Sequence, residues 1–533
     1  MTSLGWDTEE AARKTGGPTG GSTGTRADRG PGGVRTAAAF AALRLRLLLR
    51  EAPRRQTLLA LGAGLGSLLA YALVRHLARV SMVDIVVYRA EGSAVLHHGD
   101  LYGVTVTQWH LYATYPPFAA MLFTPTAWLS VGLLRVLVSA GNLLLLGVLA
   151  WLGAELVGWP RRALRPALVF LAVGLGVWLE PVFTTLRYGQ VNLFIDCLVL
   201  YDLNRPDGSR GKGVGIGLAT AIKLTPGLFA VYLLLSGRSR AAVTAGATCA
   251  ATMALGALVM PDASRSFWTG YVFETSRVGK EYIVDNQSLS GLVERLLHTE
   301  APGPLALLPT ALTAVAGLAV AVAIHRNAEG FPRARAWSVL CTAITGLLVS
   351  PISWTHHWVW CVPLLVLLAA EVAQERARTR ASSGSARSAR RRWRVRRPWR
   401  AVFLATGTAF CSYAMWLVPH HGLSNLRIPL PLQPFAGIYP LVGLAFLGLA
   451  AERLRRHLGR RRRAASVRAW PLQRALPSGA PLSGASLSGQ ERGERPVHVQ
   501  AGVLAARRDP AQGTLQPGGD GPGRGLQQGV TGR

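Results

Sequence analysis

Long apolar runs separated by short arginine-rich loops constrain this chain more than any other feature. The runs fill residues 57–451, and an α-helix needs about 20 apolar residues to cross a lipid bilayer. Hydrophobic residues make up 50% of the chain and charged residues only 16%, whereas an average soluble protein carries about 25% charged residues. The sequence therefore predicts an all-α polytopic membrane protein.

Polar stretches flank the apolar part at both ends. Residues 1–55 are polar and contain a Gly-rich stretch, and residues 464–533 are rich in Gly, Pro, Ser and Arg without a periodic apolar pattern. Such compositions do not bury enough apolar surface to fold. We predict disordered cytoplasmic tails over 1–55 and 464–533, with one transmembrane domain over 56–463 between them.

The chain carries a large positive charge, with 58 Lys and Arg against 27 Asp and Glu, a net +31. The basic residues interrupt hydrophobic spans and are not interleaved with stacking aromatics, which argues against a nucleic-acid partner. The anionic lipids of the membrane are the expected partner. The positive-inside rule places the basic loops in the cytoplasm; they are 161–165, 205–212, 238–240, 325–335, 376–400 and 453–463.

Proline-containing segments interrupt the regular alternation of spans. The apolar segments are 57–79, 116–131, 133–157, 166–180, 190–203, 214–236, 241–260, 304–324, 336–350, 358–374, 401–418 and 433–451. All basic loops lie inside only if 116–131 and 214–236 return to the side from which they enter. Both contain proline, which breaks helices, and broken helices at membrane depth occur against protein or a wet cavity. We therefore expect about 10–13 transmembrane or re-entrant helices.

The first outer loop, 80–115, opens with an acidic residue close to the end of the first span. Asp84 lies at the membrane–water boundary, where a carboxylate can act as a general base on an incoming hydroxyl. The alternative is that Asp84 only caps the helix that begins beside it. Its position alone leaves both interpretations open.

The stretch LEPVFTTLRYGQVN, 179–192, gathers polar groups where one helix ends and the next begins. A guanidinium with two amides suits a phosphate or a sugar; the groups are Glu180, Arg187, Gln190 and Asn192. A polar turn with a snorkelling arginine would look the same.

Lys223 lies in the middle of an apolar segment, shortly before Pro226. A buried ammonium group is costly unless it is paired, so ionisable residues inside the membrane are functional or paired. Lys223 is therefore a candidate for binding phosphate. Asp196, on an earlier segment, is the possible partner of a purely structural ion pair.

The outer loop 261–303 holds a dense polar set in SFWTGYVFETSRVGKEYIVDNQSLSGL. Arg277, Tyr282, Asn286 and Gln287 combine a cation, an aromatic ring and two amides. Amides bond sugar hydroxyls and aromatic rings stack on sugar faces, so we expect substrate contacts here. An ordinary amphipathic surface loop is the alternative.

Two adjacent histidines stand in SPISWTHHWVW, 350–360. His356 and His357 point in different directions if the segment is helical, so joint metal chelation is not expected. One ring could bond a phosphate or the reacting hydroxyl. HExxH and DxD motifs are absent from the sequence, and we predict no cofactor and no tightly bound metal.

Seven blocks in order resemble a known family. VDIVVYR, AVLHHGDLYG, TYPPFAAMLF, RYGQVN, GLATAIKLTPGLF, RVGKEYIVDNQSL and SPISWTHHWVW are similar to the actinobacterial polyprenyl-phosphate-mannose-dependent α-(1→2)-mannosyltransferases. These form glycosyltransferase family 87 of the GT-C superfamily. The resemblance covers roughly residues 57–450 and leaves the tails outside.

The resemblance implies a GT-C fold with a large first outer loop and an outward-facing active site in the cell membrane. It implies that Asp84 is the catalytic aspartate and that the pair of His356 and His357 belongs to the active site. Tyr88 and Arg89, in the same block as Asp84, are then expected to contact substrate. It further implies that mannose passes from a polyprenyl-phosphate donor to a hydroxyl of a glycolipid or lipoglycan, with inversion.

Other activities remain open on the sequence. A pentosyl transferase of the same fold, such as an arabinofuranosyl transferase, would differ only in the sugar pocket. A transporter of lipid-linked sugars would also use broken helices and an intramembrane lysine, although no inverted repeat is visible and the polar clusters lie on one side. A non-catalytic scaffold is a third class.

Overall fold

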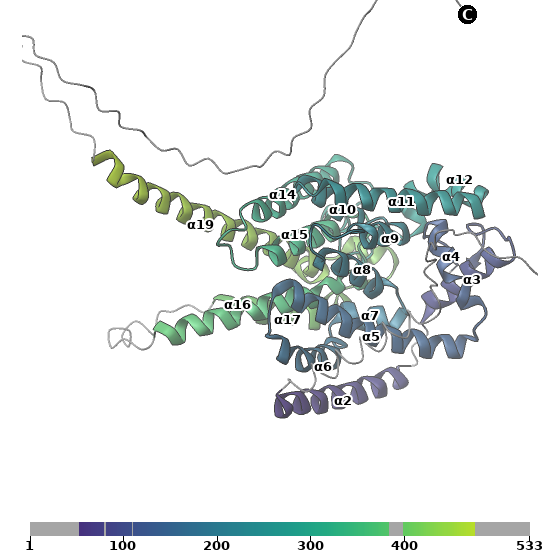
Figure 1. Cartoon of the computed structure of the whole chain (residues 1–533). Helices are drawn as coiled ribbons and strands as arrows, with labels where there is room; N and C mark the ends of the chain where they lie inside the picture. The colour runs from purple at the N-terminus through teal and green to yellow at the C-terminus, as the bar shows by residue number, and fades with distance from the viewer. Residues whose placement is uncertain (1–52, 79–81, 109, 383–397, 475–533) are drawn as a thin grey trace, which may run out of the picture. The chain divides into compact units, whose positions relative to one another are not determined.

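The computed structural model describes residues 53–78, 82–108, 110–382 and 398–474, and nearly all of these residues are helical or lie in short connections (Figure 1). The first half contains α2 (Arg54–Leu77), α3 (Val83–Leu96), α4 (Pro117–Ala127), α5 (Val131–Val157), α6 (Arg165–Gly176), α7 (Glu180–Tyr188), α8 (Asn192–Asn204), α9 (Val214–Ile222), α10 (Gly227–Leu235) and α11 (Ser239–Val259). The second half contains α12 (Pro261–Thr269), α13 (Leu289–Leu297), α14 (Pro304–Arg326), α15 (Ala334–Val349), α16 (Cys361–Ser382), α17 (Pro398–Cys411), α18 (Gln433–Ala436) and α19 (Ile438–Arg474).

Each apolar segment expected from the sequence coincides with a helix or a pair of helices. Five helices are long and apolar enough to cross a membrane: Arg54–Leu77, Val131–Val157, Ser239–Val259, Pro304–Arg326 and Thr355–Ala381. Two further pairs, each bent by 73°, raise the number to seven: Arg162–Gly176 with Glu180–Tyr188, and Leu430–Ala436 with Ile438–Ala464. The all-α multi-pass membrane architecture is thus confirmed.

The segment 214–236 is broken, as its proline predicts. Helix α9 ends at Ile222, and Lys223 takes an extended conformation with φ −149° and ψ 128° before α10 begins at Gly227. Each helix has nine residues, about 14 Å of length, which is half of a bilayer core. The break exposes polar backbone and places Lys223 at its centre.

The segment 116–131 forms a helix of only 11 residues, α4, with Pro125 inside it. Helix α4 packs against α3, α11 and α12, and these elements lie together in Figure 1. A side chain at Gly92 of α3 would place its Cβ 2.4 Å from the carbonyl oxygen of Phe123. Because only glycine permits this approach, α3 is seated closely on α4.

The first outer loop is built from α3 and a short hairpin. Strands β1 (Thr105–Val106) and β2 (Leu111–Tyr112) pair antiparallel, with Thr105 opposite Tyr112. A small buried cluster fixes this hairpin to α12, and its members are Leu101, Tyr102, Ala113, Ala120 and Phe267. The cluster packs against Ala94 and Val95, so the hairpin lies beside the end of α3.

Helix α5 lies at the centre of the packed helices and contacts α6, α8 and α16. Leu146, Leu149 and Ala150 on α5 are fully buried. By contrast, Leu59 and Leu69 on α2 are 66% and 72% exposed. In a membrane protein such leucines face lipid.

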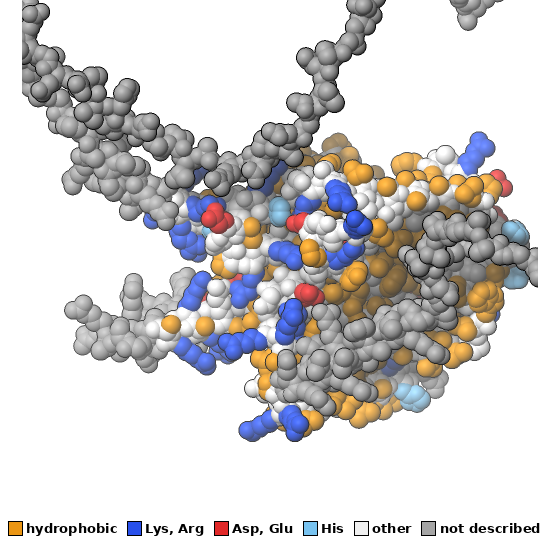
Figure 2. All heavy atoms as spheres, in the orientation of Figure 1, with side chains coloured by type: hydrophobic (Ala, Val, Ile, Leu, Met, Phe, Trp, Pro, Cys, Tyr) orange, Lys and Arg blue, Asp and Glu red, His pale blue; other side chains and the backbone are white. Residues whose placement is uncertain are grey.

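Hydrophobic side chains cover much of the surface, while Lys and Arg gather where α16 and α19 extend (Figure 2). Arg333 and Arg453 form salt bridges with the buried Glu371, with N···O distances of 3.2 and 3.0 Å. Helix α19 continues beyond residue 463 to Arg474. The remainder of both predicted tails, 1–52 and 475–533, lies outside the described residues.

Candidate active site

Asp84 lies in the first turn of α3, whose N-cap residue is Met82. Its Oδ2 accepts a hydrogen bond of 2.6 Å from Nε2 of Gln190, and its Oδ1 has no hydrogen-bond partner among the described residues. The Met82 side chain does not cap the helix, and the Asp84 carboxyl accepts no hydrogen bond from a backbone N–H of α3. The interpretation of Asp84 as a mere helix cap is therefore wrong in this structure.

The surroundings of Asp84 make it a stronger base than an exposed aspartate. Burial raises the pKa of its carboxyl from 3.8 to about 6, and the hydrogen bond from Gln190 limits the rise. A group with this pKa is ionised at neutral pH and still holds a proton well. These are the properties that a general base requires.

Gln190 occupies the turn between α7 and α8 and joins three side chains. Its Oε1 accepts from the hydroxyls of Tyr88 at 3.0 Å and Tyr115 at 3.3 Å. Asn142 of α5 donates to its backbone oxygen at 3.2 Å. Because the Oε1 end receives two donors, the Nε2 end must face Asp84.

Lys223 lies beside this network, in the break between α9 and α10. Its Nζ is 3.2 Å from Oδ1 of Asn192 and 2.6 Å from Nε2 of His357, and it lies over the ring of Tyr115 at 5.9 Å. No ion pair between Lys223 and Asp196 is formed within the described residues. The structural ion pair that the sequence left open is absent.

The hydrogen bonds of His357 define its protonation. Its Nδ1 accepts the backbone N–H of Trp354 at 3.1 Å, so Nδ1 carries no hydrogen and the ring is neutral with its hydrogen on Nε2. This Nε2–H points at Nζ of Lys223. Only an uncharged amine has the lone pair to accept it, so Lys223 is neutral in this arrangement.

His356 contributes to the site chiefly through its backbone. It belongs to η4 (Thr355–Trp360), a 3₁₀ turn at the start of α16. Its carbonyl oxygen accepts from Nδ2 of Asn192 at 3.1 Å and from Oγ1 of Thr185 at 3.2 Å. Its ring packs edge-on against Tyr188 at 5.7 Å. Thus Asn192 joins Lys223 to the histidine turn.

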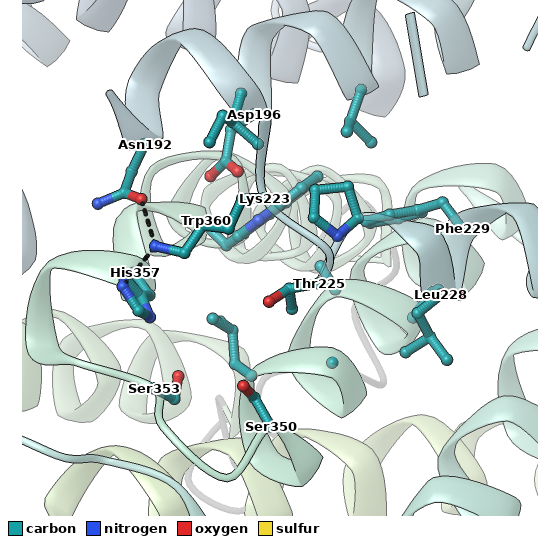
Figure 3. A pocket seen from close by; sticks show the side chains of 17 residues that line it. Asn192, Asp196, Lys223, Thr225, Leu228, Phe229, Ser350, Ser353, His357 and Trp360 are labelled. Atoms are coloured by element: carbon teal, nitrogen blue, oxygen red, sulfur yellow. Dashed lines mark hydrogen bonds between the residues drawn. The ribbon is translucent and has the colours of Figure 1, made fainter. Parts of the chain in front are cut away.

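A cavity opens beside Lys223 and His357, with about 530 Å³ of empty space when the open solvent at its mouth is included (Figure 3). Its polar side is formed by Asn192, Asp196, Lys223, Thr225, Ser350, Ser353 and His357. Its apolar side includes Phe229, Leu228, Leu347 and Trp360. The cavity therefore offers a polar end with an amine and an imidazole N–H, and an apolar wall, which suits a phosphate attached to a lipid.

Comparison with known proteins gives a family match. Residues 113–351 match the model of glycosyltransferase family 87. A phosphatidylinositol pentamannoside mannosyltransferase of Mycobacterium tuberculosis (strain CDC 1551 / Oshkosh) is 34% identical over 301 residues, 56% of this chain and 68% of the relative. It is named as polyprenol-phosphate-mannose-dependent and α-(1-2)-specific. The chain belongs to glycosyltransferase family 87.

Two further relatives agree. A polyprenol-phosphate-mannose-dependent α-(1-2)-phosphatidylinositol mannoside mannosyltransferase of Mycobacterium tuberculosis (strain ATCC 25618 / H37Rv) is 33% identical, covering 54% of this chain and 70% of the relative. The protein of the same name from Mycolicibacterium smegmatis is 35% identical, covering 54% and 69%. No solved structure matches. This family 87 chain is thus a glycosyltransferase of the membrane-embedded GT-C class, as the sequence predicted.

Two side-chain amides that we expected to bind sugar form hydrogen bonds with backbone groups of the same chain. Asn286 is fully buried; its Nδ2 donates to Pro351 O at 2.9 Å and its Oδ1 accepts from Ser353 N at 2.8 Å. Gln287, also fully buried, donates to Ala436 O at 2.7 Å and accepts from Tyr439 N at 3.1 Å. Both amides hold the segment before the histidine turn, in place of the expected sugar contacts.

Glu180 and Arg89 are likewise committed to the fold. Glu180 is fully buried at the start of α7, and it accepts from Thr184 at 2.7 Å and from the Tyr439 hydroxyl at 2.7 Å. Arg89 donates to the carbonyls of Ala127 and Leu129 after α4, at 3.3 and 3.1 Å. These contacts tie both side chains to neighbouring elements of the fold.

Arg277 and Tyr282 also lie away from Asp84 and Lys223. The Arg277 guanidinium stacks over the rings of Tyr112 at 4.4 Å and Tyr271 at 4.1 Å and donates to Tyr102 O. Tyr282 is buried, at 7% exposure. Of the predicted phosphate ligands outside the cavity, Arg187 alone is solvent-exposed, in the last turn of α7.

Reading the sequence missed Tyr115, Asn142 and Trp354. Tyr115 lies in the TYPPF block, which marks it as part of a motif without giving its role. The functions of Asn142 and of the Trp354 backbone come from contacts between distant helices. Nothing in their local sequence signals these contacts.

Proposed function

We propose that this chain transfers mannose from a polyprenyl-phosphate donor to a hydroxyl of a phosphatidylinositol-mannoside type of glycolipid. The linkage formed is α-(1→2). The printed names of relatives at 33–35% identity support the donor, acceptor class and linkage. The observation that carries the proposal is the chain of hydrogen bonds that holds Asp84 through Gln190 and places Asn192, Lys223 and His357 beside it.

In this proposal Asp84 is the general base. Its carboxylate takes the proton of the acceptor hydroxyl while the hydroxyl oxygen attacks the anomeric carbon. The bond from the anomeric carbon to the phosphate oxygen breaks, and the electron pair leaves with the polyprenyl phosphate. A single displacement inverts a β-mannosyl phosphate to an α-mannoside, so one carboxylate suffices where a glycosidase needs two.

In this proposal the departing phosphate binds on the side of the site that holds Lys223 and His357. Phosphate already leaves readily, so cations and N–H donors that stabilise its growing charge are enough. Lys223 and the Nε2–H of His357 lie in the cavity, and Arg187, exposed in the last turn of α7, is a third candidate. No cofactor is required by this chemistry.

We place the protein in the cell membrane with the site on the extracytoplasmic side. The basic loops favour a cytoplasmic position by the positive-inside rule, and Asp84 and the histidine turn belong to the opposite set of loops. A lipid-linked donor also suits a compartment without nucleotide sugars. Catalysis is assigned to residues 56–463, with the tails 1–55 and 464–533 outside the catalytic unit.

The test compares two carboxylates of similar basicity. Burial raises the pKa of both Asp84 and Asp285 to about 6. The intact chain and purified Asp84→Asn and Asp285→Asn variants would be given phosphatidylinositol mannosides with either radiolabelled mannosyl-phosphoryl polyprenol or radiolabelled arabinosyl-phosphoryl polyprenol. We expect Asp84→Asn to lose at least about 1000-fold in kcat and Asp285→Asn to remain active. Near-normal transfer by Asp84→Asn would overturn the base assignment, and transfer of arabinose but not mannose would overturn the donor.

A further inference from the structure

Asp196 is the one carboxyl that lines the cavity beside Lys223, among the described residues. It stands on α8, is 5% exposed, and its Oδ2 has no hydrogen-bond partner in the described part of the chain. Its carboxyl group points toward the side chains of Lys223 and Trp360 (Figure 3). A buried oxygen without a partner in a ligand-sized cavity calls for an explanation.

The hydrogen bonds of Lys223 and His357 favour a protonated, neutral Asp196. Lys223 is an uncharged amine while it accepts the Nε2–H of His357. An ionised carboxylate beside a neutral amine would be a lone buried charge, which costs several kcal/mol. The arrangement of lowest charge has the proton on Asp196, so Asp196 and Lys223 together carry no net charge.

The donor changes this balance, because its phosphodiester brings one negative charge. We propose that Asp196 is a positioning residue that hands its proton to Lys223 when the donor phosphate enters. The O–H bond of Asp196 breaks and an N–H bond forms on Nζ of Lys223. The new ammonium ion then lies between the phosphate and the Asp196 carboxylate, and His357 keeps its Nε2–H for the phosphate. This inference rests on the proposed function.

Asp196 fits this role better than the other groups that face Lys223. The charged groups acting on Lys223 are Asp196 and Asp84. Asn192, His357 and the ring of Tyr115 also contact its amine. Asp84 must remain ionised to act as base and is held as an acceptor by Gln190. His357 has no second proton to give while Trp354 N–H occupies Nδ1.

Proton counting tests the proposal directly. Binding of citronellyl-phosphoryl-mannose, which stays monoanionic between pH 6 and 9, would be measured by calorimetry at pH 8 in Tris and in HEPES. For the intact chain the proton moves inside the cavity, so we expect no net uptake. In Asp196→Asn the proton must come from water, so we expect uptake of about one proton per ligand. Asp196→Glu, which restores a carboxyl, should return the uptake to zero.

Kinetics give a second measurement. In Asp196→Asn the donor KM should rise about tenfold per pH unit above pH 8, since the reactive lysine form becomes scarce. The intact chain should show a flat donor KM over the same pH range. A purely structural Asp196 would lower folded yield without changing the pH profile.

The outcomes separate this inference from the proposed function. If the intact chain takes up one proton on binding, or Asp196→Asn takes up none, the proton does not come from Asp196 and the inference is overturned. If the intact chain neither binds nor transfers the mannosyl donor, the proposed function fails instead. Should Asp196→Asn not fold, the uptake by the intact chain and by Asp196→Glu decides the matter.

Discussion

Gln190 donates a 2.6 Å hydrogen bond to Asp84 across 106 residues of sequence. The same amide accepts from Tyr88 and Tyr115 on its other end, so its orientation is fixed before any substrate arrives. Gln190, in the turn between α7 and α8, thus orients the carboxylate of Asp84 on α3. Orientation of a reacting group in advance is a main source of enzymatic rate.

Replacing Gln190 with leucine should therefore slow catalysis without removing the base. A hydrogen bond to a charged group contributes about 1.5–3 kcal/mol, which corresponds to about a 10- to 100-fold loss in kcat. The donor KM should change little, because Gln190 does not line the cavity. Steady-state assays of mannosyl transfer measure both. Asn204→Leu removes a comparable amide contact to Leu152 O at the far end of α8 and should leave kcat intact; an equal loss in both variants would refute an orienting role.

The reaction should weaken in acid. Burial raises the pKa of Asp84 to about 6, and a base works only when deprotonated, so kcat/KM should be level above about pH 7. Below pH 6 it should fall about tenfold for each pH unit. Because Asp285 has a similar pKa, the same profile would be recorded for Asp285→Asn. An inflection that moves or disappears in that variant would assign it to Asp285 and not to Asp84.

The sequence predicted more of the fold than of the site. Apolar length and proline predicted the apolar helices and the break shortly before Pro226, because those properties act locally. They did not predict the helices α3, α12 and α13 within the outer loops 80–115 and 261–303. Lys223 was singled out because an ionisable group inside an apolar segment is costly without a partner, whereas Asp84 and His357 were singled out by their motifs. Their roles remain predictions. The amides Asn286 and Gln287 were misread because a polar residue looks the same whether it faces a sugar or a distant carbonyl oxygen. Only the packing of 281–288 against 351–355 decides between them.

Glu91 should make the protein less stable as the pH rises. It is 3% exposed on α3, and burial raises the pKa of its carboxyl from 4.5 to about 8. Between these values the folded chain holds a proton that the unfolded chain releases, so stability is fully present below pH 4.5 and declines toward pH 8. Glutamine needs no proton, so Glu91→Gln should stabilise the protein by about 1–3 kcal/mol at pH 7.

Thermal unfolding in detergent at several pH values checks this effect of Glu91→Gln. The gain in melting temperature should be largest near pH 8 and vanish near pH 4.5, where both forms of the protein are neutral at this position. A gain that is the same at both pH values would mean that packing, and not the proton, causes it.

The Asn286→Ala variant tests whether Asn286 stabilises the fold or binds sugar. The side chain joins 281–288 to the histidine turn by bonds to Pro351 O and Ser353 N, and the isolated β-bridge between Asn286 and Trp354 reinforces the junction. Removing the amide leaves buried partners unpaired, at about 1–3 kcal/mol each. The melting temperature should therefore fall by several degrees.

The same variant should also lower kcat. The Trp354 N–H fixes the ring of His357, and a loosened junction would misalign that ring. Each rise of about 1.4 kcal/mol in the activation free energy lowers kcat about tenfold. A sugar ligand would behave differently, because its loss raises the acceptor or donor KM and leaves the melting temperature unchanged. Measuring unfolding and both KM values on one preparation distinguishes the two roles. A raised KM with unaltered stability would show that Asn286 binds substrate, and that its bonds to Pro351 O and Ser353 N do not stabilise the histidine turn.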